Sequence, residues 1–195
     1  LDLNIGVRYD YFRVGSLMQE GGNSDESIVN FDKNIYLSSF LNGKADTFDD
    51  GYFPNHGFSL GVDYSWVFGG LHEKIKAFHY AQFNFKTVAN LGGVVSVLPF
   101  ANARLLFGEE IPTPYVNVIG GRLAGRYLDQ HIPFMGVTNS AAVSKYLAIV
   151  GAELRARVYK NNYISAIVNV GDSAPTFKDM TKMSSAFIGA GLEYS

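Results

Sequence analysis

The stretch from residue 58 to residue 68 constrains the fold most, because a large apolar side chain occupies every second position. A period of two is that of a β-strand with one apolar and one polar face. At ~3.3 Å per residue the stretch measures about 36 Å, which suffices to cross a bilayer when the strand is tilted. We therefore predict a transmembrane strand. The side chains expected to face lipid are Phe58, Leu60, Val62, Tyr64 and Trp66.

Seven other segments are also predicted as strands, most of them by the same alternation. They are residues 3–13, 35–46, 74–88, 94–107, 143–158, 163–170 and 185–194. No run approaches the ~18 apolar residues that a membrane helix needs. An aromatic content of 14% and 21 glycines favour a β-barrel over a helical protein. The sequence thus predicts an all-β, antiparallel fold with about eight strands.

The lengths of the connections separate the two ends of the predicted sheet. Long connections at residues 15–33, 108–142 and 172–183 are the first, fifth and seventh, whereas the fourth and sixth are short turns. The second, residues 47–56, is of moderate length, and the third, residues 69–73, is short. Odd and even connections lie at opposite ends of an antiparallel sheet. Long loops at one end and short turns at the other are typical of a transmembrane barrel. A soluble β-barrel that binds a small apolar ligand is the alternative, with its apolar face inward.

The longest connection contains a segment, residues 116–136, that is too apolar for a solvated loop. Long ordered connections are usually functional. Gly120 and Gly121 permit backbone turns that other residues resist. Arg122 and Arg126 need acidic partners if they are buried. We expect this loop to fold back into its own barrel and to be held there by charge.

Three pieces of the chain together resemble a known family. The first is the turn DTFDDGYFPNHG before the long strand, with Asp46, Asp49, Phe53, Pro54 and Gly57 as its marked positions. The second is the pair Gly120-Gly121, followed by Arg126 and Tyr127. The third is Glu153 in GAELRAR with Asn169 in VNVG. These pieces resemble the C-terminal barrel of the bacterial surface antigen superfamily, which includes the BamA and TamA assembly factors and the two-partner-secretion transporters.

The resemblance implies a role for each piece of the loop. Arg126 enters the lumen and pairs with Glu153, Tyr127 packs beside it, and Gly120-Gly121 makes the inward turn; Arg122 is the second candidate. The sequence departs from the family pattern in two places. Asn169 stands where the family has an Asp that also faces the arginine, and glycine precedes the arginine where the family has it following.

The resemblance also implies an architecture and a function. Residues 1–195 are expected to form the C-terminal part of one outer-membrane β-barrel domain, about eight strands of a probable sixteen. The barrel is expected to insert, export or anchor a protein domain in the outer membrane of a Gram-negative bacterium. Its partners are outer-membrane lipid and the remaining strands and N-terminal domains of the parent protein. The segment DQHIPFMG looks most like members fused to a patatin-like phospholipase domain.

No catalytic, cofactor or metal site is predicted. Gly57-Phe58-Ser59-Leu60-Gly61 fits the G-x-S-x-G nucleophile pattern, but that chemistry needs a strand-to-helix turn and here the strand alternation continues. The four histidines show no ligand spacing. A net charge of −2 indicates no nucleic-acid partner. A phospholipase serine, if the parent has one, belongs to another domain.

Overall fold

Eight long antiparallel strands form one continuous sheet in the computed structural model. The structure describes residues 1–12, 34–70, 76–121, 130–137, 141–160, 162–180, 182 and 185–195. The strands, in their order across the sheet, are β1 (Asp2–Phe12), β2 (Asn34–Asp46), β3 (Phe58–Gly70), β4 (Phe78–Thr87), β6 (Val95–Phe107), β10 (Tyr146–Tyr159), β11 (Asn162–Ala174) and β12 (Phe187–Tyr194). This confirms the predicted all-β, antiparallel fold.

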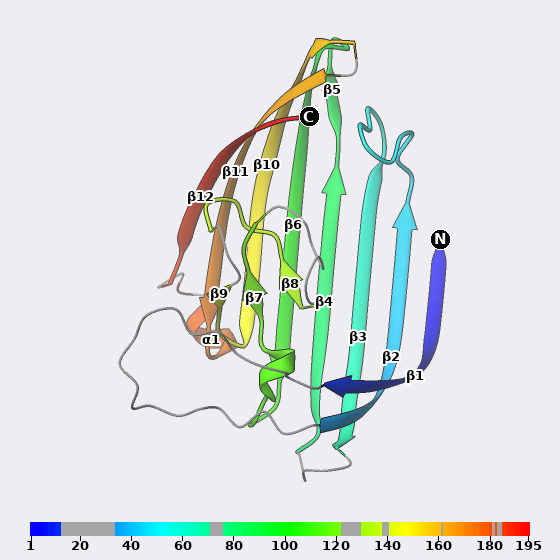
Figure 1. The fold of residues 1–195 in the computed structure, drawn as a ribbon, viewed down its shortest axis with the longest axis vertical. Helices are drawn as coiled ribbons and strands as arrows, with labels where there is room; N and C mark the ends of the chain where they lie inside the picture. Colours follow the sequence, from blue (N-terminus) through cyan, green and yellow to red (C-terminus); the bar gives the residue numbers. More distant parts are fainter. Residues whose placement is uncertain are drawn as a thin grey trace.

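The sheet curves into an open half-barrel, with β1 at one edge and β12 at the other (Figure 1). Every strand pairs with its neighbour in chain order along this path. The turns after β2 and β10 lie at the upper end of Figure 1, whereas α1 (Phe177–Met180), which follows β11, lies at the lower end. We call the lower end the loop end and the upper end the turn end.

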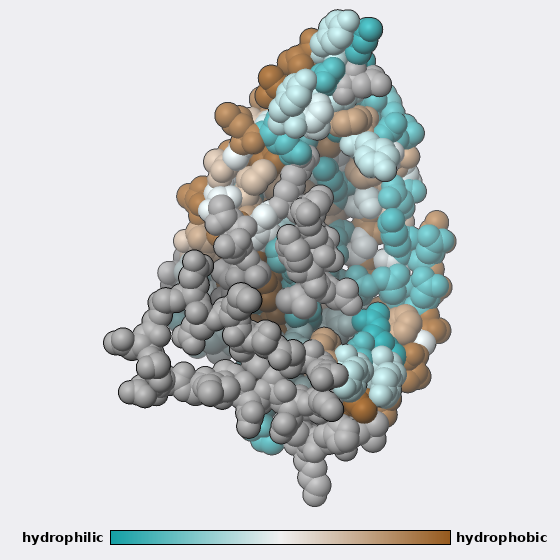
Figure 2. Space-filling view, viewed as in Figure 1, coloured by the Kyte–Doolittle hydropathy of each residue, from teal (hydrophilic) through white to brown (hydrophobic). Residues whose placement is uncertain are grey.

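The outer face of the sheet is apolar, whereas the inner face carries both polar and buried apolar side chains. On β3, Val62, Tyr64 and Trp66 are 42–46% exposed, whereas Ser65 and Val67 on the opposite face are 2% and 0% exposed. Figure 2 shows hydrophobic side chains along the left edge, over β11 and β12, and hydrophilic ones around the hollow on the right. A soluble barrel has the reverse arrangement, so the facing is that of a membrane barrel.

A break in the ladder interrupts β4 opposite Pro99. Lys86 pairs with Phe100, and the short strand β5 (Ala89–Leu91) resumes the pairing with Val97. Proline has no N–H to donate to a neighbouring strand. The N–H of Val88, at the break, donates instead to Gly57 O at 3.3 Å. The sequence placed a turn where β5 lies.

The strand bounds differ from the prediction at two further places. β4 begins at Phe78 rather than at residue 74, and β11 continues to Ala174 rather than ending at residue 170. In the described part of the chain, no helix is both long and apolar enough to cross a membrane.

A second, small sheet lies in the long connection between β6 and β10. β7 (Val118–Ile119) is its central strand, parallel to β8 (His131–Ile132) and antiparallel to β9 (Ala141–Ala142). A single 3₁₀ turn, η1 (Thr113–Tyr115), precedes it. Figure 1 shows β7 and β8 in front of β6 and β10, so the connection folds back over the wall of the half-barrel. We call residues 108–145 the in-folded loop.

Candidate functional site

The in-folded loop docks on the inner wall through an apolar cluster. Ile119, Ile132 and Phe134 of the loop pack with Leu147 and Ile149 of β10, and all five are buried. The partly buried side chains around them are Phe100, Val137, Val143 and Phe187. Sequence reasoning missed the inner position of Leu147 and Ile149. The signal was present, because the polar face of the predicted strand has no charged residue between Lys145 and Glu153.

Gly120 and Gly121, which follow β7, have backbone angles typical of glycine. Their φ angles are +147° and +57°, in the region that favours glycine. Gly121 N donates to Val137 O at 2.8 Å, and Gly121 O accepts from Phe134 N at 3.0 Å. These bonds tie the two arms of the loop together. Both glycines therefore have the backbone angles that a turn can use, and the inward turn, which would continue into residues outside the described ranges, stays a prediction.

Asn169 of β11 joins the loop to the wall. Its side chain is buried and, with its amide oriented to suit both neighbours, accepts from Met135 N at 3.0 Å and donates to Gly189 O at 2.9 Å. Asn can serve a backbone donor and a backbone acceptor at once, which an ionised Asp cannot. The residue that departs from the family pattern therefore keeps the bond that an aspartate could also accept from Met135 N, and adds a donation to Gly189 O that an ionised aspartate could not make.

Two glycines of β12 let the loop approach the strand closely. A Cβ at Gly189 would lie 1.7 Å from Met135 O, and one at Gly191 would lie 2.6 Å from Met135 Cγ. Gly136, with φ +99°, completes the contact from the loop side. No other residue type fits at position 189 without moving the loop.

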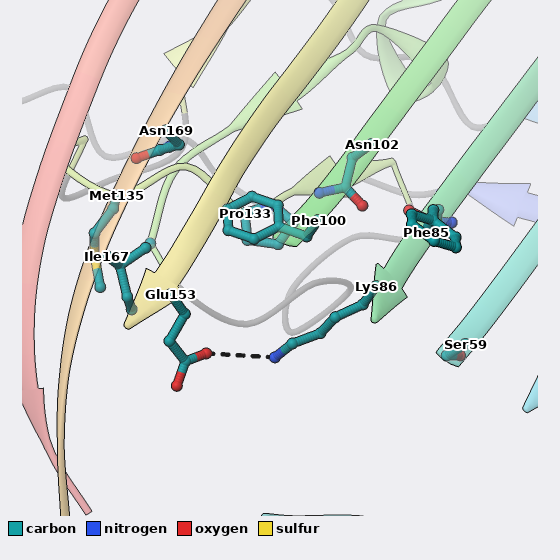
Figure 3. A pocket seen from close by; sticks show the side chains of 12 residues that line it. Ser59, Phe85, Lys86, Phe100, Asn102, Pro133, Met135, Glu153, Ile167 and Asn169 are labelled. Atoms are coloured by element: carbon teal, nitrogen blue, oxygen red, sulfur yellow. Dashed lines mark hydrogen bonds and ion pairs between the residues drawn. The ribbon is translucent and has the colours of Figure 1, made fainter. Parts of the chain in front are cut away.

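Glu153 lies on the inner face of β10 at the rim of a cavity of about 220 Å³. Its carboxylate accepts from Ser165 Oγ at 2.8 Å and forms an ion pair with Lys86 Nζ at 3.4 Å. Figure 3 shows these two charged side chains pointing toward one another, with Phe100 and Pro133 above them in the view. Arg126, Tyr127 and Arg122 lie outside the described residues, so the Arg126–Glu153 pair stays a prediction.

A buried arginine and asparagine hold the start of the loop. Arg104 of β6 donates to Tyr115 O at 2.9 Å and to Asn117 Oδ1 at 2.6 Å, and its guanidinium lies over the Tyr80 ring. Asn117 donates in turn to backbone oxygens of Arg104, Ser144 and Lys145 at 2.9–3.2 Å. Sequence reasoning did not single out Asn117, which has no charge or motif to mark it.

Tyr115 connects the in-folded loop to β1, at one edge of the sheet. Its hydroxyl donates to Asp10 Oδ2 on β1 at 2.9 Å. Burial first, and the Asp10 carboxylate second, raise the pKa of Tyr115, so the phenol keeps its proton and donates it. The loop therefore contacts both β1 and β12, the two edge strands of the described sheet.

The turn at residues 47–57 folds inward at the turn end. Phe53 stacks on Tyr163 of β11, and Arg155 of β10 lies over both rings and donates to Pro54 O. Asn55 accepts from Asn90 Nδ2 at 3.0 Å. The turn thus reaches from β2 and β3 across to β10 and β11.

Two aspartates and one glycine shape this turn. Asp49 Oδ1 accepts from the N–H groups of Asn55 and His56, and Asp50 Oδ1 from those of Tyr52 and Phe53, at 2.7–3.1 Å. These bonds hold the pKa of both carboxyls below their ordinary value. A further residue, Asp46, accepts from Phe48 N at 3.1 Å. Gly57 has φ +107°, and a Cβ there would lie 2.3 Å from Thr47 O.

The charged groups of the inner wall mainly hold backbone. Arg155 binds Pro54 O, Arg157 binds Gly93 O, and Arg104 binds Tyr115 O. Ser59 lies near the start of β3, with its hydroxyl 3.5 Å from Asp46 Oδ2. Within the described ranges, no cluster of three or more His, Asp or Glu side chains could hold a metal ion. This arrangement is suited to holding a polypeptide segment against the inner face of the sheet.

Comparison with known proteins gives one match. The family model described as the OMP85 superfamily matches residues 1–195. No curated protein and no solved structure matches the chain. The match agrees with the superfamily to which the turn, loop and strand motifs point.

Proposed function

The chain belongs to the OMP85 superfamily of outer-membrane β-barrels, and from this premise we propose that it is the loop-plugged part of a barrel that inserts, exports or anchors a protein domain. The observation that carries the proposal is the inverted facing of the sheet. Exposed apolar side chains cover the outside, and a polypeptide loop is gripped by polar and apolar groups on the inside.

The edges of the sheet support a larger barrel. On β1 the outward residues Leu3, Ile5 and Val7 are exposed, as are Ile188 and Leu192 on β12. An unpaired strand edge in a bilayer leaves backbone groups without partners, at a cost of several kcal/mol each. We therefore propose that further strands of the parent protein pair with these edges, and that the full barrel has sixteen strands.

The finer identity of the parent is part of the proposal. The sequence of residues 129–136, DQHIPFMG, supports a translocator or anchor for a patatin-like phospholipase domain in a Gram-negative outer membrane. Phe134, Met135 and Gly136, within that stretch, contact β12. The subfamily likeness therefore lies at the point where the loop meets the wall.

The soluble alternative is less well supported. A barrel that binds a small apolar ligand needs an enclosed apolar interior, whereas the inner cavity here has the charged groups of Lys86 and Glu153 beside apolar side chains such as Phe100 and Ile167. The exposed apolar stripes of β3, β10 and β12 would also face water in such a protein.

The test is fractionation of cells that express the full-length parent protein. We expect it in the outer-membrane fraction, extracted by detergent and migrating as a folded barrel in unheated gels. Protease added to intact cells then reports whether an N-terminal domain is exposed outside, which separates export from periplasmic anchoring. A monodisperse protein that is soluble without detergent would contradict the membrane proposal. Labelling of the full-length protein by a fluorophosphonate tests for a phospholipase serine.

A further inference from the structure

A row of aromatic side chains runs across the outer wall near the loop end. We propose that this row, together with α1, forms the contact with the lipid headgroup layer at that end, so that α1 rests on the membrane surface rather than over the mouth of the barrel. The inference rests on the proposed membrane function and adds the position of one membrane boundary to it.

The row begins on β3 and continues onto β4. Trp66 and Phe68 meet edge to face with ring centroids 5.5 Å apart. His79 is the cross-strand partner of Trp66 and stacks on it at 5.8 Å and an interplanar angle of 9°. The Tyr64 hydroxyl is hydrogen-bonded to His79 Nδ1 at 2.6 Å. Rings with polar atoms at their edges are typical of the interface between headgroups and hydrocarbon.

The row then passes over β6 and β10 to α1. Phe107 is the cross-strand partner of His79, and its ring lies 5.6 Å from that of Tyr146. The Tyr146 ring lies 6.2 Å from that of Phe177, the first residue of α1. Consecutive rings thus connect β3 with the segment that follows β11.

The burial pattern of β11 shows that α1 lies on the outer side of the wall. Alternation from the exposed Val168 puts Asp172 and Ala174 on the outer face, yet they are only 6% and 2% exposed. Pairing of Asp172 with Ala148, two residues from the exposed Val150, gives the same facing. α1 packs on β11, and we attribute the burial of these two outer positions to the segment that contains it.

The chemistry of α1 fits a headgroup layer. Phe177 is 60% exposed, while Lys178 and the paired Asp179 and Lys182 give the same segment charged groups. An exposed aromatic ring beside lysines can bury its apolar part while the ammonium groups reach phosphate and water. Such a segment is unsuited to the hydrocarbon centre and well suited to the boundary.

The spacing along β10 agrees with this boundary. From Tyr146 to Val158, both on the outer face, the strand covers about 40 Å at ~3.3 Å per residue. At a tilt of about 40° this corresponds to roughly 30 Å along the membrane normal, which is the thickness of the hydrocarbon core. Tyr146 and the ring of Phe177 beside it therefore lie at one edge of the core.

The test places a nitroxide label at one introduced cysteine at a time in the full-length protein, reconstituted in phospholipid vesicles. Phe177→Cys reports α1, Val150→Cys reports the outer wall between the two membrane boundaries, and Tyr52→Cys reports the exposed inward-folded turn at the turn end. Collision with oxygen, which concentrates in the bilayer core, is compared with collision with a water-soluble nickel chelate. We expect the ratio of oxygen to nickel collisions to be highest at position 150, lowest at 52, and intermediate at 177.

The outcomes separate the inference from the function on which it rests. A ratio at 177 equal to that at 52 puts α1 in water, and a ratio equal to that at 150 puts it in the core; either result overturns the inference while the barrel stays in the membrane. A ratio at 150 as low as that at 52 overturns the proposed function itself. Lys178→Cys provides a second site on α1 if the label at 177 disturbs the fold, with the same expected ratio.

Discussion

Phe53, in the turn between β2 and β3, stacks on Tyr163 of β11 with ring centroids 4.2 Å apart and an interplanar angle of 17°. The guanidinium of Arg155 lies within 6 Å of both ring centres. One end of the half-barrel is therefore bridged by side chains as well as by the sheet.

This relationship predicts a measurable coupling between the two rings. In a double-mutant cycle with Phe53→Ala and Tyr163→Ala, we expect a coupling energy of about 0.5–1.5 kcal/mol, the range found for aromatic pairs. The readout is the free energy of unfolding of the barrel in detergent. Tyr52→Ala is the control, because that side chain is 89% exposed. Strict additivity of the two losses would mean that the stack contributes nothing.

A second prediction concerns the contact between β12 and the loop. Gly189→Ala should destabilise the barrel by about 1–3 kcal/mol, because the added methyl group overlaps Met135 O and the loop must shift. Gly61→Ala is the matched control, since a Cβ there meets its nearest neighbour at 3.8 Å. Unfolding in urea gives both values. If the two variants lose the same stability, the loop does not rest on β12.

A third prediction concerns the facing of β3. Val62→Arg should cost about 2–4 kcal/mol, because it puts a cation on the lipid side near mid-membrane depth. Ser59→Arg should be tolerated much better, since Ser59 lines the inner cavity. Folding yield into lipid vesicles compares them. Equal damage from the two changes would refute the assignment of faces.

A fourth prediction concerns Glu153. If Arg126 pairs with it, Arg126→Ala should cost less than the ~3–5 kcal/mol of a stranded buried charge, because Glu153 keeps its ion pair with Lys86, and adding Glu153→Ala should recover part of that loss. Lys86→Met should cost less, since the Lys86 side chain is 41% exposed. Heat stability in detergent is the measure. Additive losses for Arg126 and Glu153 would mean that no such pair exists.

A fifth prediction concerns acid. Backbone N–H groups of His56 and Asn55 lower the pKa of Asp49 in the folded turn. The stability from this carboxylate is present above its unfolded pKa, near 3.9, and is lost as the pH falls below that value toward the folded pKa. Asp49→Asn can still accept these bonds but does not titrate. Its melting temperature should therefore fall less steeply than that of the wild type between about pH 5 and pH 3.

A control separates this carboxylate from its neighbour. Asp50 also has a lowered pKa, through the N–H groups of Phe53 and Tyr52. The double variant Asp49→Asn with Asp50→Asn should lose less melting temperature between about pH 5 and pH 3 than either single variant. If the melting temperature of the double variant falls with pH as steeply as that of the wild type, the turn does not contribute to acid sensitivity.

The strands were predictable because alternation is a local property of the sequence. Phe58 to Phe68 and Tyr146 to Val158 each carry their facing in every second residue, and the structure has strands at both. The pattern alone could not decide which face is inside, because soluble and membrane barrels share it. Pro99 is also a local signal, but the break that it causes lies in the neighbouring strand, between the end of β4 and the start of β5.

The site was less predictable because its contacts are distant in sequence. Glu153 was found through its place on a polar face, and Asn169 through family likeness. The hold of Asn117 on three backbone oxygens, and the fit of Met135 on Gly189, depend on how the loop lies in space. The reason for a small residue at position 189 becomes apparent only from the three-dimensional structure, in which Met135 packs against it.

The span of the in-folded loop also sets an order for folding. The loop binds Asp10 near one end of the chain and Gly189 near the other, so its docking site exists only after the first and last described strands are in place. Contacts of such high sequence separation form slowly, because chain entropy is lost before they stabilise anything. Seating of the loop is therefore a late step in biogenesis. Protection of Gly120 and Gly121 from hydrogen exchange would time the completion of this wall.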